Sequence, residues 1–318
     1  MKTHQDQIWI SESRERAIVE QLYNTITDQG FGSLDQNQNK NYGFPWSYVR
    51  GDLKISCRIV DSVFFPELDP DTDTIITDNI PLQSIDSNLI NVLPEFWGIW
   101  QFDPVYENRP ASIGFNCFMN RIRGDRSRTF YELVRRNILN KGLVSFNCTQ
   151  AEYMDQYKQA ELYDYWQEHD QRLSLVPYNT VETHGELEQC IIDSNVSLIL
   201  ETYVSDSHIV FSEKIFRALQ LPRPWLLYCS PGSVLCLKQY GFDVLADYVD
   251  HSYDEITEHN SRHLIILNQL ETFIDKVYTE HDYARFNRAA AHNQQLLKHF
   301  AAKWPSKFNE VLEKIKQI

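Results

Sequence analysis

The stretch from Val196 to Asp254 constrains the fold most, because strand patterns and helix patterns alternate along it. Short apolar runs of the buried-strand type are separated by amphipathic segments with helical spacing. The patterns predict strands at 197–203, 224–228 and 242–245, and helices at 187–194, 212–220 and 233–240. Such an alternation favours a parallel sheet whose strands are joined by right-handed crossovers. We therefore predict an α/β domain in this part of the chain.

The first half of the chain predicts a second α/β unit. Its expected strands are 7–10, 53–60, 73–77, 97–102, 113–119 and 143–146. One helix is predicted to end near Thr27, and another spans Thr129 to Asn140 on a capping-box pattern, Thr129-x-x-Glu132. From Glu255 onward the pattern is almost wholly helical, and a last helix at 308–315 is able to fold back against the first domain.

A polar segment rich in Tyr and Gln, from Thr149 to Asn179, separates the two halves. Domain boundaries fall in polar linkers of this kind, so we predict two Rossmann-like domains, 1–176 and 177–318, that face each other across a cleft. The second domain carries the helical C-terminus. Ligands of such sheets collect at the carboxyl ends of the strands, and the residues that follow each strand are therefore the site candidates.

The formal net charge of −14 restricts the partners of this chain of 318 residues. Its field repels a polyanion, so nucleic acid is disfavoured as a partner, although a local basic patch is able to override that field. No apolar run approaches the ~20 residues that cross a bilayer, and the N-terminus has no secretory signal pattern. The six cysteines lack disulfide or zinc spacing. These features favour a cytoplasmic location without membrane partners.

The first candidate site combines Glu201 with Ser212-Glu213-Lys214. Glu201 is expected near the carboxyl end of its strand, and the triplet opens the following helix. A lysine in a first turn opposes the helix dipole unless an anion binds there. A carboxylate beside it suits the two hydroxyls of a ribose. The alternative is a solvated Glu-Lys pair on an amphipathic helix.

The second candidate site is a cluster of four arginines, Arg121, Arg123, Arg126 and Arg128, that follows a predicted strand. The planar guanidinium matches phosphate oxygens in pairs, so the cluster suits a pyrophosphate. The alternative is a solvated loop in which Asp125 is the internal partner. The turn Ser230–Ser233 is a weaker candidate for a ligand cradle, and a tight connection is its alternative. No metal site is predicted.

Two stretches resemble a known family. The segment LETYVSDSHIVFSEKIFRALQLPRPWLLYCSPG resembles the donor-binding segment of fucosyltransferase-like glycosyltransferases, with Glu201 and Ser212-Glu213-Lys214 on matching positions. The segment FNCFMNRIRGDRSRTFYELVRRNILNKGLVSFN is similar to a Leu-Asn-Arg…Arg segment of uncharacterised viral and bacterial proteins with the same motif. Thr202 stands where the family has Asn, and the spacer before Ser212 is longer.

The resemblance implies a GT-B fold and a nucleotide-diphosphate sugar as donor. The N-terminal domain would face the acceptor, and the C-terminal domain would bind the donor. Glu213 would hold the ribose, Lys214 the diphosphate, and Arg128 the diphosphate from across the cleft, with Arg121, Glu201 and Ser212 in the same donor site. These cations would stabilise charge on the leaving diphosphate, which needs no metal and no further cofactor.

The general base is expected to be a carboxylate of the first domain. Asp103 is the first choice and Glu12 the second, because each follows a predicted strand. The acceptor hydroxyl belongs to a glycan, a protein or a modified base. The location would be the cytoplasm, or the host cytoplasm for a viral protein. Two alternatives stay open: a non-catalytic nucleotide-sugar-binding or scaffold protein of the same fold, and an α/β protein without a nucleotide ligand.

Overall fold

The computed structural model divides the chain into two units. Unit 1 comprises Met1–Gln101, Ser205–Val210 and Gln295–Ile318, and unit 2 comprises Phe102–Val204 and Phe211–Gln294. The residues that the structure describes are 32–33, 46–50, 55–60, 73–77, 80–81, 90–92, 94–102, 110–119, 124–146, 184–201, 204 and 208–315.

Unit 2 is built on a parallel sheet of four strands, in the order β11-β9-β7-β8. The strands are β7 (Ile113–Met119), β8 (Gly142–Phe146), β9 (Ser194–Leu200) and β11 (Trp225–Tyr228). The side chains of β11, and most of those of β9, are buried on both faces, as expected of strands in a covered parallel sheet. Between β7 and β9 the Asn116 amide donates a buried hydrogen bond of 2.9 Å to the Ser197 hydroxyl. The predicted α/β class with a parallel sheet is confirmed.

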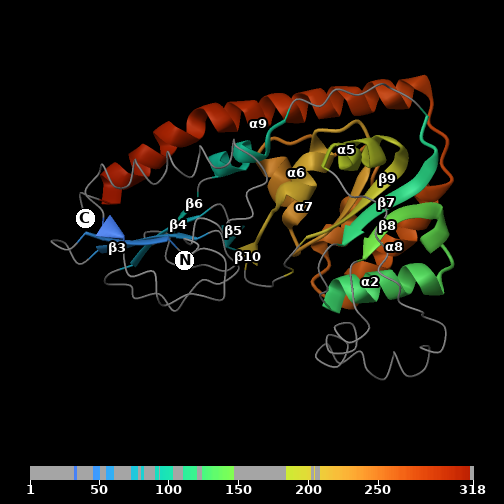
Figure 1. Cartoon of the computed structure of the whole chain (residues 1–318), viewed down its shortest axis with the longest axis horizontal. Coiled ribbons are helices and arrows are strands. Elements are labelled where there is room, and N and C mark those ends of the chain that lie inside the picture. Colours follow the sequence, from blue (N-terminus) through green and yellow to red (C-terminus); the bar gives the residue numbers. More distant parts are fainter. Residues whose placement is uncertain are drawn as a thin grey trace, which may run out of the picture. The chain divides into compact units, whose positions relative to one another are not determined.

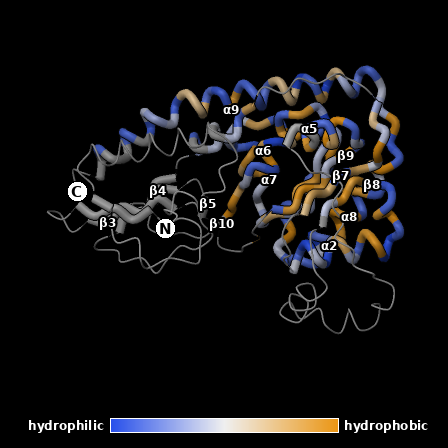
Figure 2. The backbone as a smooth tube through the Cα atoms, viewed as in Figure 1, coloured by the Kyte–Doolittle hydropathy of each residue, from blue (hydrophilic) through white to orange (hydrophobic). Residues whose placement is uncertain are grey.

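Helices cover both faces of this sheet (Figure 1). On one face lie α5 (His184–Ile192) and α6 (Glu213–Leu219), and on the other lie α2 (Gly124–Arg135) and α8 (His259–Ile274). Thr129 of α2 and His263 of α8 are joined by a hydrogen bond of 2.8 Å. Figure 2 shows the strands β7 and β9 as apolar segments between more polar helices. Unit 2 therefore has the three-layer arrangement of a Rossmann-like sheet.

α2 begins at Gly124, and the start predicted at Thr129 is wrong. The Thr129 hydroxyl does not cap the helix but donates to the Asp125 carbonyl one turn earlier, at 2.9 Å, a bond that threonine makes inside helices. Glu132 is buried and accepts hydrogen bonds from Arg135 instead of reaching back to a cap. The chain then passes through η3 (Leu139–Lys141) into β8.

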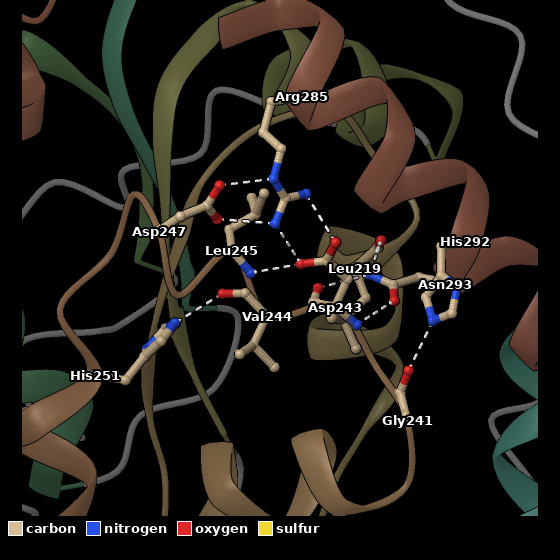
Figure 3. A network of polar contacts seen from close by, with 10 residues as sticks. All are labelled: Leu219, Gly241, Asp243, Val244, Leu245, Asp247, His251, Arg285, His292 and Asn293. Atoms are coloured by element: carbon tan, nitrogen blue, oxygen red, sulfur yellow. Dashed lines mark hydrogen bonds and ion pairs between the residues drawn. The ribbon is translucent and has the colours of Figure 1, made fainter.

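The strand predicted at 242–245 is absent, and irregular backbone joins α7 (Ser233–Gln239) to η5 (His251–Glu255). Asn293 takes the place of a neighbouring strand there. Its Oδ1 accepts the Asp243 N–H at 2.8 Å and its Nδ2 donates to the Asp243 carbonyl at 3.0 Å (Figure 3). Leu245 has φ 55°, in the left-handed region, which ends any extended course.

α9 (Glu280–Ile315) is one long helix, so the predicted segment 308–315 is its end. Its start is fixed by reciprocal bonds: Asp282 Oδ2 accepts the Thr279 N–H at 2.7 Å, and the Asp282 N–H donates to Thr279 Oγ1 at 3.3 Å. The hydroxyl of Tyr248 donates to the other oxygen of Asp282 at 2.5 Å. Across the described ranges, including α9, no helix has both the length and the apolar character that spanning a bilayer requires.

Unit 1 contains a mixed sheet in the order β1-β2-β3-β4-β6. Its strands are β1 (Gly32–Ser33), β2 (Trp46–Arg50), β3 (Ile55–Val60), β4 (Asp73–Thr77) and β6 (Ile90–Val92), and a separate pair joins β5 (Ile80–Pro81) to β10 (His208–Ile209). The strand predicted at 73–77 is confirmed, and that at 53–60 is confirmed as β3. β1, β2 and β3 run antiparallel, while β3, β4 and β6 run parallel. The described part of unit 1 thus differs from the all-parallel sheet expected of a Rossmann-like domain.

The strand predicted at 97–102 is wrong, because Pro94–Trp100 form the 3-10 helix η2. Trp97 is fully buried and its ring packs edge-on to that of Phe300, with centroids 6.3 Å apart. At Gly98 an added Cβ would lie 2.1 Å from the backbone nitrogen of Ala301, so only glycine permits this approach. The apolar run is therefore explained by contact with α9 and not by strand pairing.

The boundary predicted at 176/177 divides the chain differently from the structure. It separates β7 and β8 from β9 and β11, whereas all four strands belong to one sheet, with Phe115 paired to Val196. The physical reason is that β7 is a central strand, whose backbone groups need a hydrogen-bonded neighbour on each side. Residues 147–183, outside the described residues, connect β8 to α5 within unit 2.

Candidate functional site

The strand order of unit 2 creates a topological switch point between β7 and β9. From β7 the chain moves outward to β8, and from β9 it moves outward in the opposite direction to β11. In open α/β sheets ligands bind outside the carboxyl ends of the strands at such a point. The segments that follow these two strands are the arginine-rich stretch that leads into α2 and the residue Glu201.

Glu201 directly follows β9 and is hydrogen-bonded to Ser212 at the start of α6. Its side chain is buried, its Oε1 accepts the Ser212 N–H at 3.1 Å, and its Oε2 accepts the Ser212 hydroxyl at 2.5 Å. The Glu201 N–H continues the sheet by donating to the Tyr228 carbonyl at 3.0 Å. Burial raises the pKa of Glu201, and the Lys214 ammonium and the Ser212 hydrogen bond oppose this shift.

Ser212 is the N-cap of α6 and also holds the lysine that follows it. Its Oγ accepts the Lys214 N–H at 3.4 Å and the Lys214 ammonium at 3.0 Å. The same ammonium lies 3.0 Å from Glu213 Oε1. Burial alone would raise the pKa of Glu213, but the charge and hydrogen bond of Lys214 bring it below its usual value. The Glu213 side chain is 42% exposed and that of Lys214 23%, so both can meet a ligand.

A second polar cluster lies at the carboxyl end of β11. The buried Tyr228 hydroxyl donates to Asp125 Oδ1 at 3.3 Å, and the Arg262 guanidinium lies over the Tyr228 ring, 5.6 Å from its centroid. Arg128 donates to the side-chain oxygen of Asn260. Burial raises the pKa of Tyr228 and Asp125 adds to this rise, so the hydroxyl keeps its proton. The cluster brings a cationic side chain of α2 to the strand beside β9.

The turn Ser230–Ser233 is a tight connection between β11 and α7 and not a ligand cradle. Gly232 has φ 79°, and its N–H donates to the Asp254 carbonyl at 2.8 Å. The Asp254 carboxylate then accepts the Leu235 N–H at 2.9 Å, so an acidic side chain occupies the first turn of α7. A ligand phosphate placed there would meet a buried negative charge.

His259 and His263 of α8 have the i, i+4 spacing of metal ligands on a helix. In the structure His259 Nδ1 pairs with Arg262 at 3.1 Å, and His263 Nε2 pairs with Thr129 at 2.8 Å. Burial lowers the pKa of His263 to about 3, and Arg128 contributes. Within the described ranges no three His, Cys, Asp or Glu side chains gather in a way that suits a metal ion.

The structure brings together four of the predicted site residues, and it corrects the place of a fifth. Glu201, Ser212, Glu213 and Lys214 form one hydrogen-bonded cluster. Arg128 belongs to unit 2 like Lys214, whereas the prediction places the two in opposite domains. Of the remaining predicted residues, Arg126 is buried in α2, whereas Arg121, Arg123, Asp103 and Glu12 lie outside the described residues.

Sequence reasoning missed Tyr228 and gave Asp254 no role. Tyr228 is the last residue of a strand predicted at 224–228, so its place at the carboxyl end of that strand was a usable signal. Asp254 offered no such signal, because it lies nineteen residues after the amide that it caps. Comparison of the chain with protein-family models, curated proteins and solved structures found no match.

Proposed function

We propose that this chain is a glycosyltransferase that takes its sugar from a nucleotide-diphosphate donor. The donor would bind at the carboxyl edge of the unit 2 sheet, next to the switch point between β7 and β9. The sugar would pass to a hydroxyl of a glycan, a protein or a modified base.

The observation that carries the proposal is the hydrogen-bonded cluster of Glu201, Ser212, Glu213 and Lys214. A buried carboxylate fixes a hydroxyl, and the hydroxyl accepts a hydrogen bond from the ammonium of Lys214, whose side chain is 23% exposed. The cluster follows β9, one of the two strands that define the switch point. An oriented cation in this place suits a phosphate group, and the neighbouring carboxylate suits vicinal hydroxyls.

The proposed roles follow from these positions. Lys214 would contact the diphosphate and stabilise the charge that develops on it as the sugar leaves. Glu213 would accept hydrogen bonds from the ribose hydroxyls. Arg128 would support the diphosphate from within the same unit, together with Arg121. A carboxylate, with Asp103 as first choice, would remove the proton of the acceptor hydroxyl.

Ligand-induced stabilisation tests the binding step. The panel would contain UDP, GDP, ADP, CDP and dTDP, each titrated over the same concentration range. A ligand at about 100 times its dissociation constant stabilises the folded protein by about 2.7 kcal/mol. We expect one nucleotide to stabilise the wild type, and Lys214→Met to weaken its binding about tenfold, the loss of one hydrogen bond to a charged group. Lys238→Met, an exposed lysine on α7, is the matched control.

Release of the nucleoside diphosphate from the matching nucleotide sugar, with and without an acceptor, tests the transfer step. Binding without any release would favour the non-catalytic nucleotide-sugar-binding protein. If the melting temperature responds to none of the nucleotides, the proposed donor site is wrong. Equal affinity of wild type and Lys214→Met would remove Lys214 from it.

A further inference from the structure

Glu201 cannot itself meet a ligand, although the resemblance counts it among the donor-site residues. The side chain is 4% exposed, and both carboxylate oxygens accept hydrogen bonds from Ser212, one from the amide and one from the hydroxyl. Its backbone N–H is bound to the Tyr228 carbonyl. Whatever Glu201 contributes to the site must therefore pass through Ser212.

We propose that Glu201 is a positioning residue that sets the direction of the Lys214 ammonium through the hydroxyl of Ser212. The inference rests on the proposed function, since it is the phosphate contact of Lys214 that this positioning serves. It goes beyond that function by assigning the buried carboxylate a role in orienting the cation.

The direction of the hydrogen bonds carries the argument. A serine hydroxyl has one proton and two lone pairs. The contact of 2.5 Å between Ser212 Oγ and Glu201 Oε2 has the length of a hydroxyl that donates to a carboxylate. With its proton committed, Ser212 presents its lone pairs to the Lys214 ammonium, 3.0 Å away. Glu201 thereby determines that Ser212 accepts from Lys214.

A neutral side chain at position 201 would disturb this order. The amide of a glutamine, or the proton of an uncharged Glu201, is able to donate to Ser212 Oγ and to occupy a lone pair that Lys214 uses. The proton of the Ser212 hydroxyl would then be free to turn toward the Lys214 ammonium, and the partial positive charge on that proton would repel the ammonium. The oriented lysine depends in this way on an ionised carboxylate that no ligand touches.

The charged and titratable groups that face Glu201 are few among the described residues. They are Lys214 and Glu213 of α6 and the thiol of Cys229, which follows β11. Burial raises the pKa of Cys229 to about 12, and Glu201 adds to the rise, so this thiol stays neutral. Burial raises the pKa of Glu201 too, while Lys214 opposes the shift. As the pH falls through that raised pKa, Glu201 takes up a proton and the orientation of Lys214 is lost.

The test measures Lys214 directly and needs no nucleotide. Reductive methylation of the full chain, followed by peptide mass spectrometry, gives the rate at Lys214 relative to Lys238 of the same protein. We expect Glu201→Gln and Ser212→Ala to raise this ratio severalfold, because the ammonium loses its oriented acceptor. Ser212→Thr keeps a hydroxyl and is expected to behave like the wild type. Should Glu201→Gln fail to fold, Ser212→Ala still tests the relay with Glu201 in place.

Binding of inorganic pyrophosphate, measured by calorimetry, supplies the second measurement. In both Glu201→Gln and Ser212→Ala its dissociation constant is expected to rise about fivefold, which corresponds to ordering one long side chain anew. As the pH falls, the dissociation constant of the wild type for pyrophosphate should approach that of Glu201→Gln. A merely structural role of Glu201 would not produce this pH profile.

The outcomes separate the two proposals. A ratio for Lys214 that is unchanged in both variants overturns the positioning role, whatever the protein binds. A raised ratio with weaker pyrophosphate binding supports it. A raised ratio in a protein whose wild type binds neither pyrophosphate nor any nucleoside diphosphate supports the positioning of Lys214 and contradicts the proposed donor site.

Discussion

Two charged clusters in unit 2 hold their cations in different ways. Arg285 of α9 donates four hydrogen bonds to two carboxylates, at 2.7 and 2.9 Å to Asp243 and at 2.7 and 2.8 Å to Asp247 (Figure 3). Lys214 of α6 donates to the Ser212 hydroxyl and to Glu213, at 3.0 Å each. The two cationic side chains are almost equally exposed, 18% and 23%, so burial does not distinguish them. The partners do.

The difference shows what separates a structural ion pair from one that is able to serve a ligand. The guanidinium of Arg285 is bound along two edges by carboxylates, which fits its planar fork and ties α9 to the segment 241–250. Lys214 is oriented by a neutral hydroxyl, and the carboxylate beside it is 42% exposed. Removal of Arg285 should therefore cost stability, whereas removal of Lys214 should cost binding.

The largest expected effect is that of Arg285→Met on stability. We expect a loss of about 2 kcal/mol, because hydrogen bonds to charged groups each contribute about 1.5–3 kcal/mol when shielded and less when partly exposed. Lys141→Met is the control, because Lys141 forms an ion pair with Asp275 in which the two side chains are 45% and 79% exposed. Its effect should stay within about 0.5 kcal/mol. Hydrogen exchange of the first turns of α9, together with thermal unfolding, provides the measurement. Equal losses in the two variants would contradict the comparison.

The ion pair between Arg285 and Asp243 predicts that the stability of the protein depends on pH. Burial alone would raise the pKa of Asp243, but the hydrogen bonds from Arg285 bring it below its ordinary value of about 3.9. A lowered pKa means that the stabilisation is present above pH ~3.9 and is lost as the pH falls through the folded-state pKa. The difference in melting temperature between wild type and Arg285→Met should therefore shrink below about pH 4. A difference that stays constant in acid would show that packing of the Arg285 side chain, and not its charge, holds α9.

A smaller effect is expected for Asp254→Ala, which removes a carboxylate that binds amides instead of a guanidinium. Loss of a helix cap costs about 1 kcal/mol, and the Leu235 N–H loses its acceptor at 2.9 Å. Asp254→Asn keeps one acceptor oxygen and should cost less. Exchange of the first-turn amides of α7 gives a direct measurement. If Asp254→Ala lost as much stability as Arg285→Met, the number of charged partners would not determine the loss of stability.

The sequence predicts elements well where their pattern is local. The strands at 113–119 and 73–77 agree with β7 and β4, and the strand at 224–228 agrees with β11 to within one residue, because buried apolar runs have few alternatives. The prediction fails where distant residues decide. Asn293 replaces a strand neighbour for Asp243, and α9 covers Trp97, and neither partner is visible in the local pattern.

The candidate site shows the same division. The motif Ser212-Glu213-Lys214 and the carboxyl-end place of Glu201 are readable from the sequence, and the structure joins these residues. The roles of the two glutamates cannot be predicted from the sequence, because the sequence does not show which carboxylate is buried and which is exposed. Only the three-dimensional structure shows that the Glu201 side chain is buried and that the Glu213 side chain is 42% exposed. Likewise, the long polar segment before α5 suggests a linker, while the strand pairing shows that one sheet continues across it.

The smallest expected effect is on the pH dependence of stability in Glu201→Gln. Burial raises the pKa of Glu201, so its contribution is fully present below the ordinary glutamate pKa of about 4.3 and is lost as the pH rises through the folded-state pKa. This slope is opposite in sign to that of Asp243, whose pKa is lowered. We expect the melting temperature of the wild type, relative to Glu201→Gln, to fall as the pH rises above about 4.3. Parallel curves for the two proteins would mean that the carboxylate is as well solvated as in the unfolded chain, and the positioning of Lys214 by an enclosed charge would then lose its basis.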